Sequence, residues 1–551
     1  MKRYIALASI ALAALATPAC SDDFLDETPK SSYTPETLTD ANGVEASLVG
    51  LHNIFSQFWS WSDRQGWLCC WQVGTDVATP AQPQGVETEF YQYAKMSPSS
   101  NGPSRMWTIC YQLINNANIV IASLDGGQTT LAPDAAAAAS AEARFFRAYA
   151  YNHLATLFGG VPLVTEPTQS ARTDYVRAPL SEVDDLIVSD LTFAAANLPD
   201  VGATAAQSRA NRYMAKQLLG EVCLRMGRPA DAIGPLTDII ESGRFELVRA
   251  RYGVDLANDG DYYHDMFIHG NMRRSQGNTE TIWTYEIENP SKVTGGYTGA
   301  PQHRRVWTAA YYQFAAMQLC DSLGGRGLAR LRLSSWVYNR LYAEGDIRNS
   351  NFNIRRHIYY NNPADEYAEQ YGREIRAGEF GVAEGDSLYK FPPYCTKWNC
   401  FAPDDTFGWA AIHDWCMMRL GETYLLRAEA YLMSGSPDKA ADDINVLRQR
   451  AFADYPTRGY VAAADVDLDF ILDERARELI GEENRRMTLM RTRTLVERAA
   501  RNKDGEAVGY NISGLTATHL LLFNKNAAKD ACTCRNLQAS LFFQKTKKIE
   551  S

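Results

Sequence analysis

The segment EARFFRAYAYNHLATLFGGVPL, residues 142–163, carries a clear helical pattern. Phe146, Ala150, His153 and Leu157 recur at steps of three and four, which places them on one face of an α-helix. The pair Gly159-Gly160 before Pro162 then ends the pattern. The segment therefore predicts a helix over residues 135–158 that packs one side against a core.

Two further stretches predict helical hairpins. Residues 213–226 and 230–241 are periodic and flank the turn Gly227-Arg228-Pro229. Their spacing of Leu219-Gly220, Ala232 and Leu236 is typical of a tetratricopeptide repeat, in which small residues let two helices approach closely. Residues 428–444 repeat this spacing, with Ala428, Tyr431, Ala440 and Ile444 at the matching positions. Two matches so far apart do not make a continuous solenoid. We expect the hairpins to pack together in space while long insertions leave the stack.

The insertions differ from the helical segments in composition. Residues 58–106 and 289–341 are rich in Trp, Tyr, Gly, Pro, Gln and Asn, and residues 381–408 form a third irregular stretch. We predict loops with a few short strands, such as residues 281–286. The last strong helix is expected at about residues 470–490, where a preceding acidic segment suits the positive end of a helix dipole. Insertions that leave a rigid scaffold are candidates for function.

The bulk composition excludes one class of partner. The chain has 551 residues, 46% of them hydrophobic and 22% charged, so it can bury a large core. Its formal net charge is −10. General nucleic-acid binding requires a basic surface that neutralises phosphates, so nucleic acid is not an expected partner.

The N-terminus resembles an export signal. Lys2 and Arg3 precede an apolar stretch at residues 5–16, which is too short to span a membrane. The small residues before Cys20 resemble a lipobox, which predicts a signal peptide over residues 1–19 and lipidation of Cys20. The alternative is an ordinary cleaved signal with an incidental cysteine.

An exported chain permits disulfides among its eleven cysteines. The short spacing within Cys395/Cys400 and within Cys532/Cys534 suggests local bridges, although the sequence does not fix connectivity.

Several ordered blocks resemble one known family. The acidic stretch SDDFLDETP follows Cys20, and the segment at 142–163 is the most specific match. Later blocks are NTETIW at 278–283, RLGETYLLRAEAYL at 419–432 and ILDERARELIGEENRRMTLMR at 471–491. In this order they are similar to the SusD/RagB family of outer-membrane nutrient-binding lipoproteins.

The resemblance implies a mainly α, tetratricopeptide-like scaffold with long irregular insertions. It implies one domain over residues 20–551, with an N-terminal part at about 20–230 and a C-terminal part at about 270–551. It also implies a lipid-anchored cell-surface protein of the outer membrane that captures a nutrient and delivers it to a SusC-like TonB-dependent transporter, without catalysis or a cofactor.

The C-terminal tail departs from the family pattern. From about Phe523 the sequence FNKNAAKDACTCRNLQASLFFQKTKKIES replaces the expected Pro-Ile-Pro and Gln-Asn-Pro-Gly-Tyr segments. Either the lineage has diverged or the reading frame has shifted, and the second would make Cys532 and Cys534 accidental thiols.

Motifs for catalysis or metal binding are missing from the sequence. It contains no HExxH, GxSxG, P-loop or Rossmann glycine pattern. The opening of a calcium loop at Asp465, Asp467 and Asp469 lacks the required glycine and glutamate, because Phe470 and Ala476 stand there. Charged residues at 474–486 resemble an active-site cluster, but on a helix they fall into (i, i+3) and (i, i+4) pairs. Salt bridges that tie this helix to the repeats are the preferred interpretation. We predict no metal site.

Aromatic residues in the insertions suggest the ligand chemistry. Sugar rings stack on aromatic faces, and their hydroxyls need carboxylates, amides and guanidinium groups as partners. Both kinds of group occur in the first two insertions, which in SusD-like proteins border the ligand surface that faces the transporter. The predicted ligand-binding residues are Trp67, Trp71, Gln84, Glu87, Tyr91, Tyr93, Tyr297, His303, Arg305, Trp307 and Tyr311.

The predicted ligand is a glycan, and a peptide, as on the RagB side of the family, is the alternative. A surface glycosidase is a remote third reading. It would need two carboxylates about 5–10 Å apart, for which Glu87 and Glu89 are the only insertion candidates.

Overall fold

The computed structural model describes residues 40–502 except 60–65, 98, 128, 169, 171, 205–207, 290, 295–301, 321, 401–410 and 456. The predicted signal peptide, Cys20, Tyr297, Cys532, Cys534 and the atypical tail lie outside the described residues.

The described part of the chain is mainly α-helical, as predicted. Its α-helices are α2 (Ala41–Ser56), α3 (Gly66–Cys69), α4 (Asn101–Asp125), α5 (Pro133–Phe158), α6 (Leu180–Asn197), α7 (Arg212–Arg225), α8 (Pro229–Ile240), α9 (Tyr262–Asp265), α10 (His303–Trp307), α11 (Leu420–Met433), α12 (Pro437–Ala451), α13 (Leu468–Leu479), α14 (Arg485–Arg491) and α15 (Leu495–Ala499). Its strands are β1 (Ala78–Pro80), β2 (Thr281–Tyr285), β3 (Leu331–Leu333), β4 (Ile354–Arg355), β5 (Tyr394–Cys395) and β6 (Trp415–Arg419).

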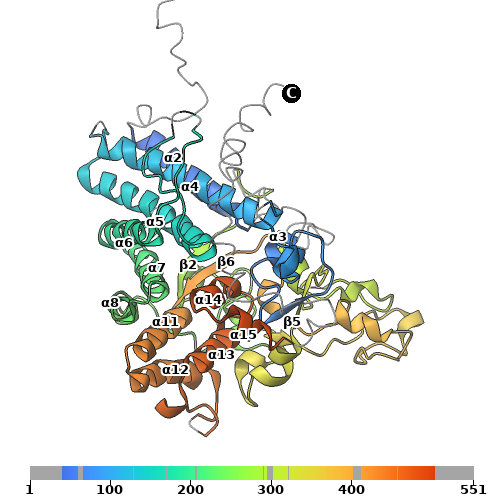
Figure 1. Ribbon diagram of the computed structural model, residues 1–551. Helices are drawn as coiled ribbons and strands as arrows, with labels where there is room; N and C mark the ends of the chain where they lie inside the picture. The colour runs from blue at the N-terminus through green and yellow to red at the C-terminus, as the bar shows by residue number, and fades with distance from the viewer. Residues whose placement is uncertain are drawn as a thin grey trace, which may run out of the picture.

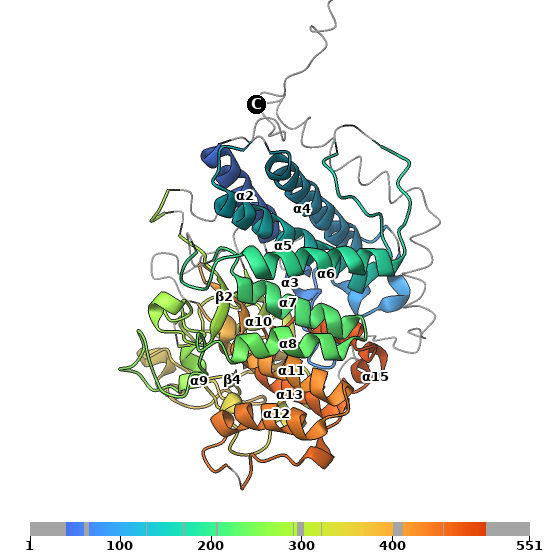
Figure 2. The same cartoon turned by 90° about the vertical axis from the view of Figure 1, so that its left-hand side faces the viewer.

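The long helices form a stack. Figure 2 shows α4, α5, α6, α7 and α8 following one another, with α11 and α12 continuing below α8. The predicted hairpins α7–α8 and α11–α12 are therefore neighbours in space although they are far apart in the chain. Residues of both share one small core, formed by Cys223, Leu224, Ala232, Leu236, Leu426 and Ala430. This arrangement confirms the tetratricopeptide-like scaffold.

Helix α5 has the limits that its sequence predicts. Pro133 stands in the first turn, where its missing N–H costs nothing. The helix ends at Gly159, whose φ of 74° lies in the region that glycine tolerates best. Its charged residues face neighbouring helices, and Arg147 donates two hydrogen bonds of 2.7 Å to Asp190 of α6. The signature helix is thus fixed by packing and by buried charge pairs.

The strands form three two-stranded antiparallel sheets among the described residues. β2 matches the strand predicted at 281–286 and pairs with β6, directly before α11. β1 of the first insertion pairs with β3 of the second, with Thr79 opposite Arg332. The two insertions therefore meet, as expected from the family resemblance.

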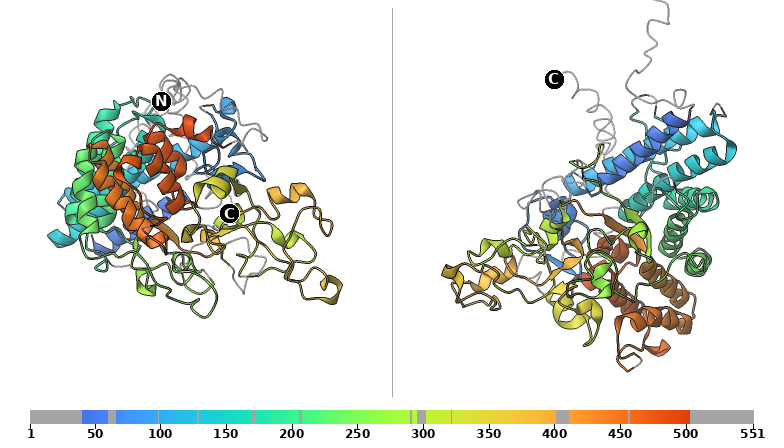
Figure 3. Two further views of the ribbon diagram at one scale, coloured as in Figure 1. Left: turned by 90° about the horizontal axis from the view of Figure 1, so that it is seen from below. Right: turned by 180° about the vertical axis from the view of Figure 1, so that it is seen from behind.

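The irregular segments lie to one side of the helical stack (Figures 1 and 3). Residues within 309–394 form a projecting lobe, seen at the right of Figure 1. The lobe has a small hydrophobic core of its own, made of Ala309, Tyr311, Ala316, Met317, Leu323, Ile358, Tyr360, Ile375, Val382 and Tyr394.

The prediction of a single helix at residues 470–490 is wrong in one respect. The structure has two helices there, separated by a turn. Helix α13 ends at Leu479, and Gly481 adopts a φ of 81°. Asn484 then starts α14 by accepting a hydrogen bond from the backbone N–H of Met487 at 3.2 Å. The break turns the chain so that charged residues on each side face different partners.

The predicted Cys395–Cys400 bridge is also wrong. Cys395 and Cys400 are not joined in a disulfide. The thiol of Cys395 contacts the carbonyl oxygen of Ile480 at 3.6 Å, and that of Cys400 contacts the carbonyl of Ile412 at 3.2 Å. Burial raises the pKa of Cys395 to about 11, so this thiol is poorly reactive.

Within the described part of the chain, we find no helix whose length and hydrophobicity would allow it to cross a bilayer.

The contact between α7 and α8 gives a test of the scaffold. A Cβ atom at Gly220 would lie 2.7 Å from Cγ of the fully buried Leu236. Alanine normally stabilises a helix relative to glycine by roughly 0.5–1 kcal/mol, whereas overpacking costs about 1–3 kcal/mol. We expect Gly220→Ala to lower the free energy of unfolding, measured by urea titration followed by circular dichroism.

The control is the same substitution in a Leu236→Ala background, where the clash is absent. There, Gly220→Ala should be neutral or stabilising. Equal effects of the substitution in both backgrounds would contradict the proposed close approach of the two helices.

Candidate functional site

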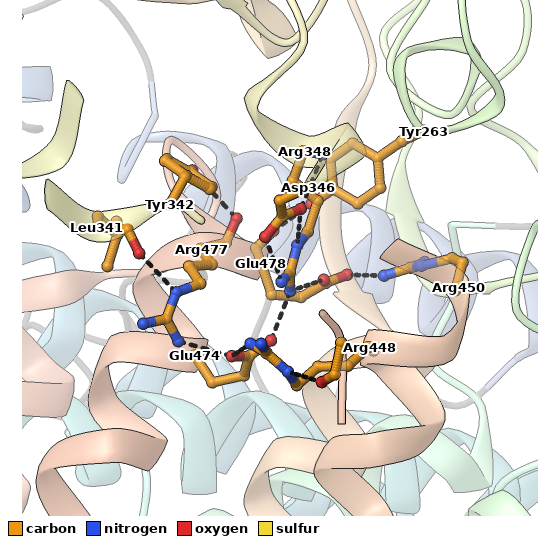
Figure 4. Close-up of polar contacts among 12 residues, drawn as sticks. Tyr263, Leu341, Tyr342, Asp346, Arg348, Arg448, Arg450, Glu474, Arg477 and Glu478 are labelled. Atoms are coloured by element: carbon orange, nitrogen blue, oxygen red, sulfur yellow. Dashed lines mark hydrogen bonds and ion pairs between the residues drawn. The ribbon is translucent and has the colours of Figure 1, made fainter. Parts of the chain in front are cut away.

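A buried network of charged side chains is centred on Glu478 of α13 (Figure 4). Its carboxylate accepts a hydrogen bond from Arg419 at 2.7 Å, another from Arg348 at 3.0 Å, and a third from Arg450. The side chains of Glu478, Arg348 and Arg450 have no solvent exposure. The hydroxyl of Tyr263 donates to the backbone carbonyl of Glu478.

Glu474, one turn earlier, is a second centre of the network. Arg477 lies 2.7 Å from its carboxylate, Arg348 2.8 Å and Arg448 3.0 Å. Burial by itself raises the pKa of Glu474, but the guanidinium of Arg348, followed by those of Arg477 and Arg448, outweighs this effect and lowers the pKa to about 2.

This network is structural. Each of its carboxylates is matched by guanidinium groups, and none is open to a ligand. Salt bridges that tie this helix to a repeat are confirmed, because Arg448 and Arg450 of α12 contact Glu474 and Glu478, but the predicted pairs between adjacent helical turns are mostly wrong. Only Arg477–Glu474 is a close (i, i+3) pair, whereas Arg419, Arg348 and Arg450 reach α13 from elsewhere in the chain. Helix α13 faces the core on this side, so its charges meet partners from other elements.

The first insertion is packed more tightly than the sequence suggests. Trp67 is fully buried, and its indole N–H donates to the carbonyl of Phe58 at 2.9 Å. The rings of Trp67 and Trp71 lie 5.1 Å apart in an edge-to-face contact. The carboxylate of Glu87 accepts from the backbone N–H groups of Gln84 and Gly85, at 2.5 and 2.9 Å, and so stabilises a turn.

Two tyrosines of the first insertion serve the same packing. Tyr91 is buried. Tyr93 is half-buried, and its hydroxyl donates to the carbonyl of Gly74 at 2.8 Å while it accepts from Arg486 at 3.0 Å.

The second insertion behaves similarly. His303, Arg305, Trp307 and Tyr311 are all buried. His303 stacks on Trp398 with the ring centroids 4.1 Å apart, and burial lowers its pKa to about 3. These rings contribute to packing between the insertions.

The predicted residues are therefore brought into one region, but their rings do not form an exposed face. Of the predicted residues within the described chain, only Gln84 and Tyr93 are more than slightly exposed. The expectation of an exposed aromatic platform at these positions is wrong, because Trp and Tyr in irregular segments fill the space between insertions that have no regular core face. Their direct contact with a ligand stays a prediction.

Exposed aromatic groups lie instead on the projecting lobe. The chain from His357 to Tyr360 alternates exposed and buried residues, as a half-buried strand does. Ile358 and Tyr360 enter the lobe core, and Tyr359, which is 49% exposed, pairs with Glu374 of the returning segment.

We call the outer side of this pairing the hairpin face; it consists of His357, Tyr359, Glu374 and Arg376. His357 and Arg376 both contact the carboxylate of Glu374, at 2.5 and 2.8 Å. Hydrogen bonding from His357, then from Arg376, lowers the pKa of Glu374. An open phenol ring thus lies beside an ionised carboxylate and a guanidinium group.

The hairpin face escaped the sequence analysis. Its signal is the alternation in His357-Ile358-Tyr359-Tyr360, which is only four residues long. Short alternation of this kind is weak evidence, and it gave no indication that the partner strand would bring Glu374 and Arg376.

The paired state of Glu474 predicts an acid-sensitive fold. A carboxylate with a lowered folded-state pKa stabilises the protein above its unfolded pKa of about 4.5, and this stabilisation is lost as the pH falls toward about 2. Glu474→Gln leaves three guanidinium groups, two of them buried, short of a partner, so we expect it to reduce the free energy of unfolding by about 3–5 kcal/mol at pH 7.

Urea unfolding at pH 7 and pH 3 measures both effects, and the difference between the two proteins should shrink at pH 3. The matched control is Asp231→Asn, which removes an exposed pair with Arg228 and should change little. A Glu474→Gln protein as stable as the wild type at pH 7 would contradict the assigned role of this network.

Comparison with known proteins agrees with this architecture. A family model described as "SusD family" matches residues 279–520, and another described as "Starch-binding associating with outer membrane" matches residues 23–224. SusD-like protein P25 of Formosa agariphila is 24% identical over 513 residues, which span 86% of this chain and 88% of that protein. A SusD-like protein of Bacteroides ovatus is 28% identical over 309 residues, 52% of this chain and 53% of that protein.

Solved structures share the fold. A laminarin-binding SusD-like protein superposes with a TM-score of 0.62 at 21% identity, covering 84% of this chain and 94% of its own. Surface glycan-binding protein A from Bacteroides thetaiotaomicron in complex with laminarihexaose gives a TM-score of 0.65 at 16% identity, covering 90% and 99%. With both family models matched in order and the same helical stack, the chain belongs to the SusD/RagB family.

Proposed function

We propose that this protein binds a glycan at the cell surface and delivers it to a SusC-like TonB-dependent transporter. The observation that carries the proposal is the hairpin face, an open tyrosine ring beside an ionised carboxylate and a guanidinium group on a lobe that projects from a rigid scaffold. Such a face matches the apolar side and the hydroxyl groups of a sugar ring.

An open face also suits a delivery function. Glu374 is already oriented by His357 and Arg376, so little ordering is needed when a hydroxyl group binds. One exposed ring provides modest affinity, and modest affinity permits release to a transporter. Two proteins of similar structure, a laminarin-binding SusD-like protein and a surface glycan-binding protein in complex with laminarihexaose, support the choice of a glycan.

We infer that the protein acts without breaking a bond. The remote alternative of a glycosidase relied on Glu87 and Glu89, and the Glu87 carboxylate is buried and accepts from two backbone N–H groups. A carboxylate held in this way stabilises a turn and is closed to a scissile bond. Among the described residues, no three His, Cys, Asp or Glu side chains gather as a metal site.

Calorimetric titration of the form beginning at Ser21 tests the binding proposal. The panel contains laminarin, other plant, host and microbial glycans, and a peptide digest. We expect saturable binding to one glycan class, weakened about fivefold by Tyr359→Ala, since one aromatic contact contributes about 1 kcal/mol.

The matched control is Tyr460→Ala, which removes an equally exposed tyrosine elsewhere on the surface and should leave binding unchanged. Binding to peptides alone would assign the chain to peptide import, and hydrolysis of any glycan would rule out the non-catalytic function.

Anchoring at the outer membrane is part of the same proposal. Cys20 follows a signal-like segment, and acyl chains on its thiol and new N-terminus would hold the protein at the membrane. We expect Cys20→Ser to abolish incorporation of labelled palmitate and to move the protein from the outer-membrane fraction to the soluble fraction. Continued labelling of the variant would contradict lipidation at Cys20.

A further inference from the structure

A cavity separate from the lobe lies beneath the signature helix. It is lined by residues of α5, α7, β2, β6, α11 and the α13–α14 connection, and by Trp59. Its interior measures about 100 Å³, and the space reaches about 810 Å³ when its open mouth is counted. An interior of this size exceeds what one water molecule needs.

The cavity has an excess of negative charge. Four of its lining residues are glutamates, namely Glu221, Glu422, Glu482 and Glu483. Glu482 and Glu483 are neutralised, because Arg419 lies 2.7 Å from the first and Arg475 2.7 Å from the second.

Glu422 is held by neighbours on both of its oxygens. It accepts from Arg475 at 2.8 Å and from Gln217 at 3.0 Å. Burial raises the pKa of Glu422, against the lowering effect of Arg475, and the charge of Glu221 raises it further.

Glu221 differs from the other three. Within the described part of the chain it forms no ion pair, and its one hydrogen bond comes from the amide of Asn152 at 3.5 Å. A half-buried carboxylate without a cation favours a positively charged ligand.

His153 adds an acceptor to the same cavity. Its Nδ1 lies 3.0 Å from the carbonyl oxygen of Tyr149, and a carbonyl only accepts, so Nδ1 carries the proton. Burial lowers the pKa of His153 to about 4, which keeps the ring neutral and leaves the lone pair of Nε2 as an acceptor.

Two tryptophans provide the rest of the lining. Trp283 is fully buried, and its indole N–H lacks a hydrogen-bond partner within the described residues. Trp59 is half-buried at the cavity and offers an apolar ring. The indole N–H of Trp59 also lacks a hydrogen-bond partner within the described residues. The cavity therefore combines acceptors with negative charge, two unused indole donors and an aromatic wall.

A metal ion does not satisfy this set, since no three His, Cys, Asp or Glu side chains of the described chain come close enough to ligate one. A protonated amine is larger than a bare metal ion and donates three hydrogen bonds without fixed geometry. The unused indole N–H groups of Trp283 and Trp59 suit hydroxyl groups of the same ligand.

We propose that this cavity binds an amino sugar through its protonated amine, with Glu221 as the charged contact and the sugar ring against Trp59. The choice of a sugar among amines rests on the proposed glycan-binding function, whereas the preference for an ammonium group follows from the cavity alone.

Tryptophan fluorescence and calorimetry with glucosamine, N-acetylglucosamine, glucose and lysine test the proposal on the form beginning at Ser21. We expect glucosamine to bind at least tenfold more tightly than N-acetylglucosamine or glucose, because only glucosamine carries the ammonium group. Glu221→Gln should weaken glucosamine binding at least tenfold, and the matched variant Glu241→Gln, on the exposed end of α8, should not.

Three outcomes would overturn the proposal: glucosamine fails to bind, N-acetylglucosamine binds equally well, or Glu221→Gln leaves binding intact. Lysine binding as tightly as glucosamine would overturn the assignment to a sugar. The Tyr359→Ala protein separates the two sites, since it should bind glucosamine as tightly as the wild type while its binding to the glycan panel is weakened about fivefold. If only the glycan panel fails to bind, the proposed glycan site on the lobe is wrong. If only glucosamine fails to bind, the proposed amine site in the cavity is wrong.

Discussion

Burial of Glu474 and Glu478 on one side of α13 constrains much of the remaining structure. An ionised carboxylate without a partner is very costly in a protein interior, so each of these groups must meet its guanidinium partners when the chain folds. The partners come from η8 (Ile347–Asn349), from the end of β6 and from α12. A buried network of this kind adds little net stability, but it allows few alternative arrangements of these segments.

The same constraint joins the two kinds of structure in the molecule. The helical stack is held by apolar packing between successive hairpins, which sequence periodicity specifies well. The insertions have no such period, and pairing of β1 with β3 and the buried charges fix them beside the stack. A rigid scaffold then supports a lobe whose outer side is free to carry recognition chemistry.

The sequence predicted what depends on local order. Helix α5, the hairpin α7–α8 and strand β2 follow from periodicity, turn residues and the close approach at Gly220. The sequence did not predict the direction of side chains whose contacts lie in distant segments. Trp67 and Trp307 lie in the short helices α3 and α10, within segments without an apolar period, so nothing local indicated that they face inward. The sequence predicted one helix at residues 470–490, because the helical period continues on both sides of the turn at Gly481.

Asp76 of the first insertion illustrates a further consequence. It is fully buried, and it lies 2.6 Å from Arg485 and 2.7 Å from Arg498, which are 409 and 422 positions further along the chain. A chain that emerges N-terminus first therefore carries this aspartate without its partners until nearly the whole polypeptide is present. In the first part of that interval, until β3 is present, β1 also lacks its partner strand and is open to wrong contacts. The time needed to complete the first insertion is thus governed by the last helices to appear.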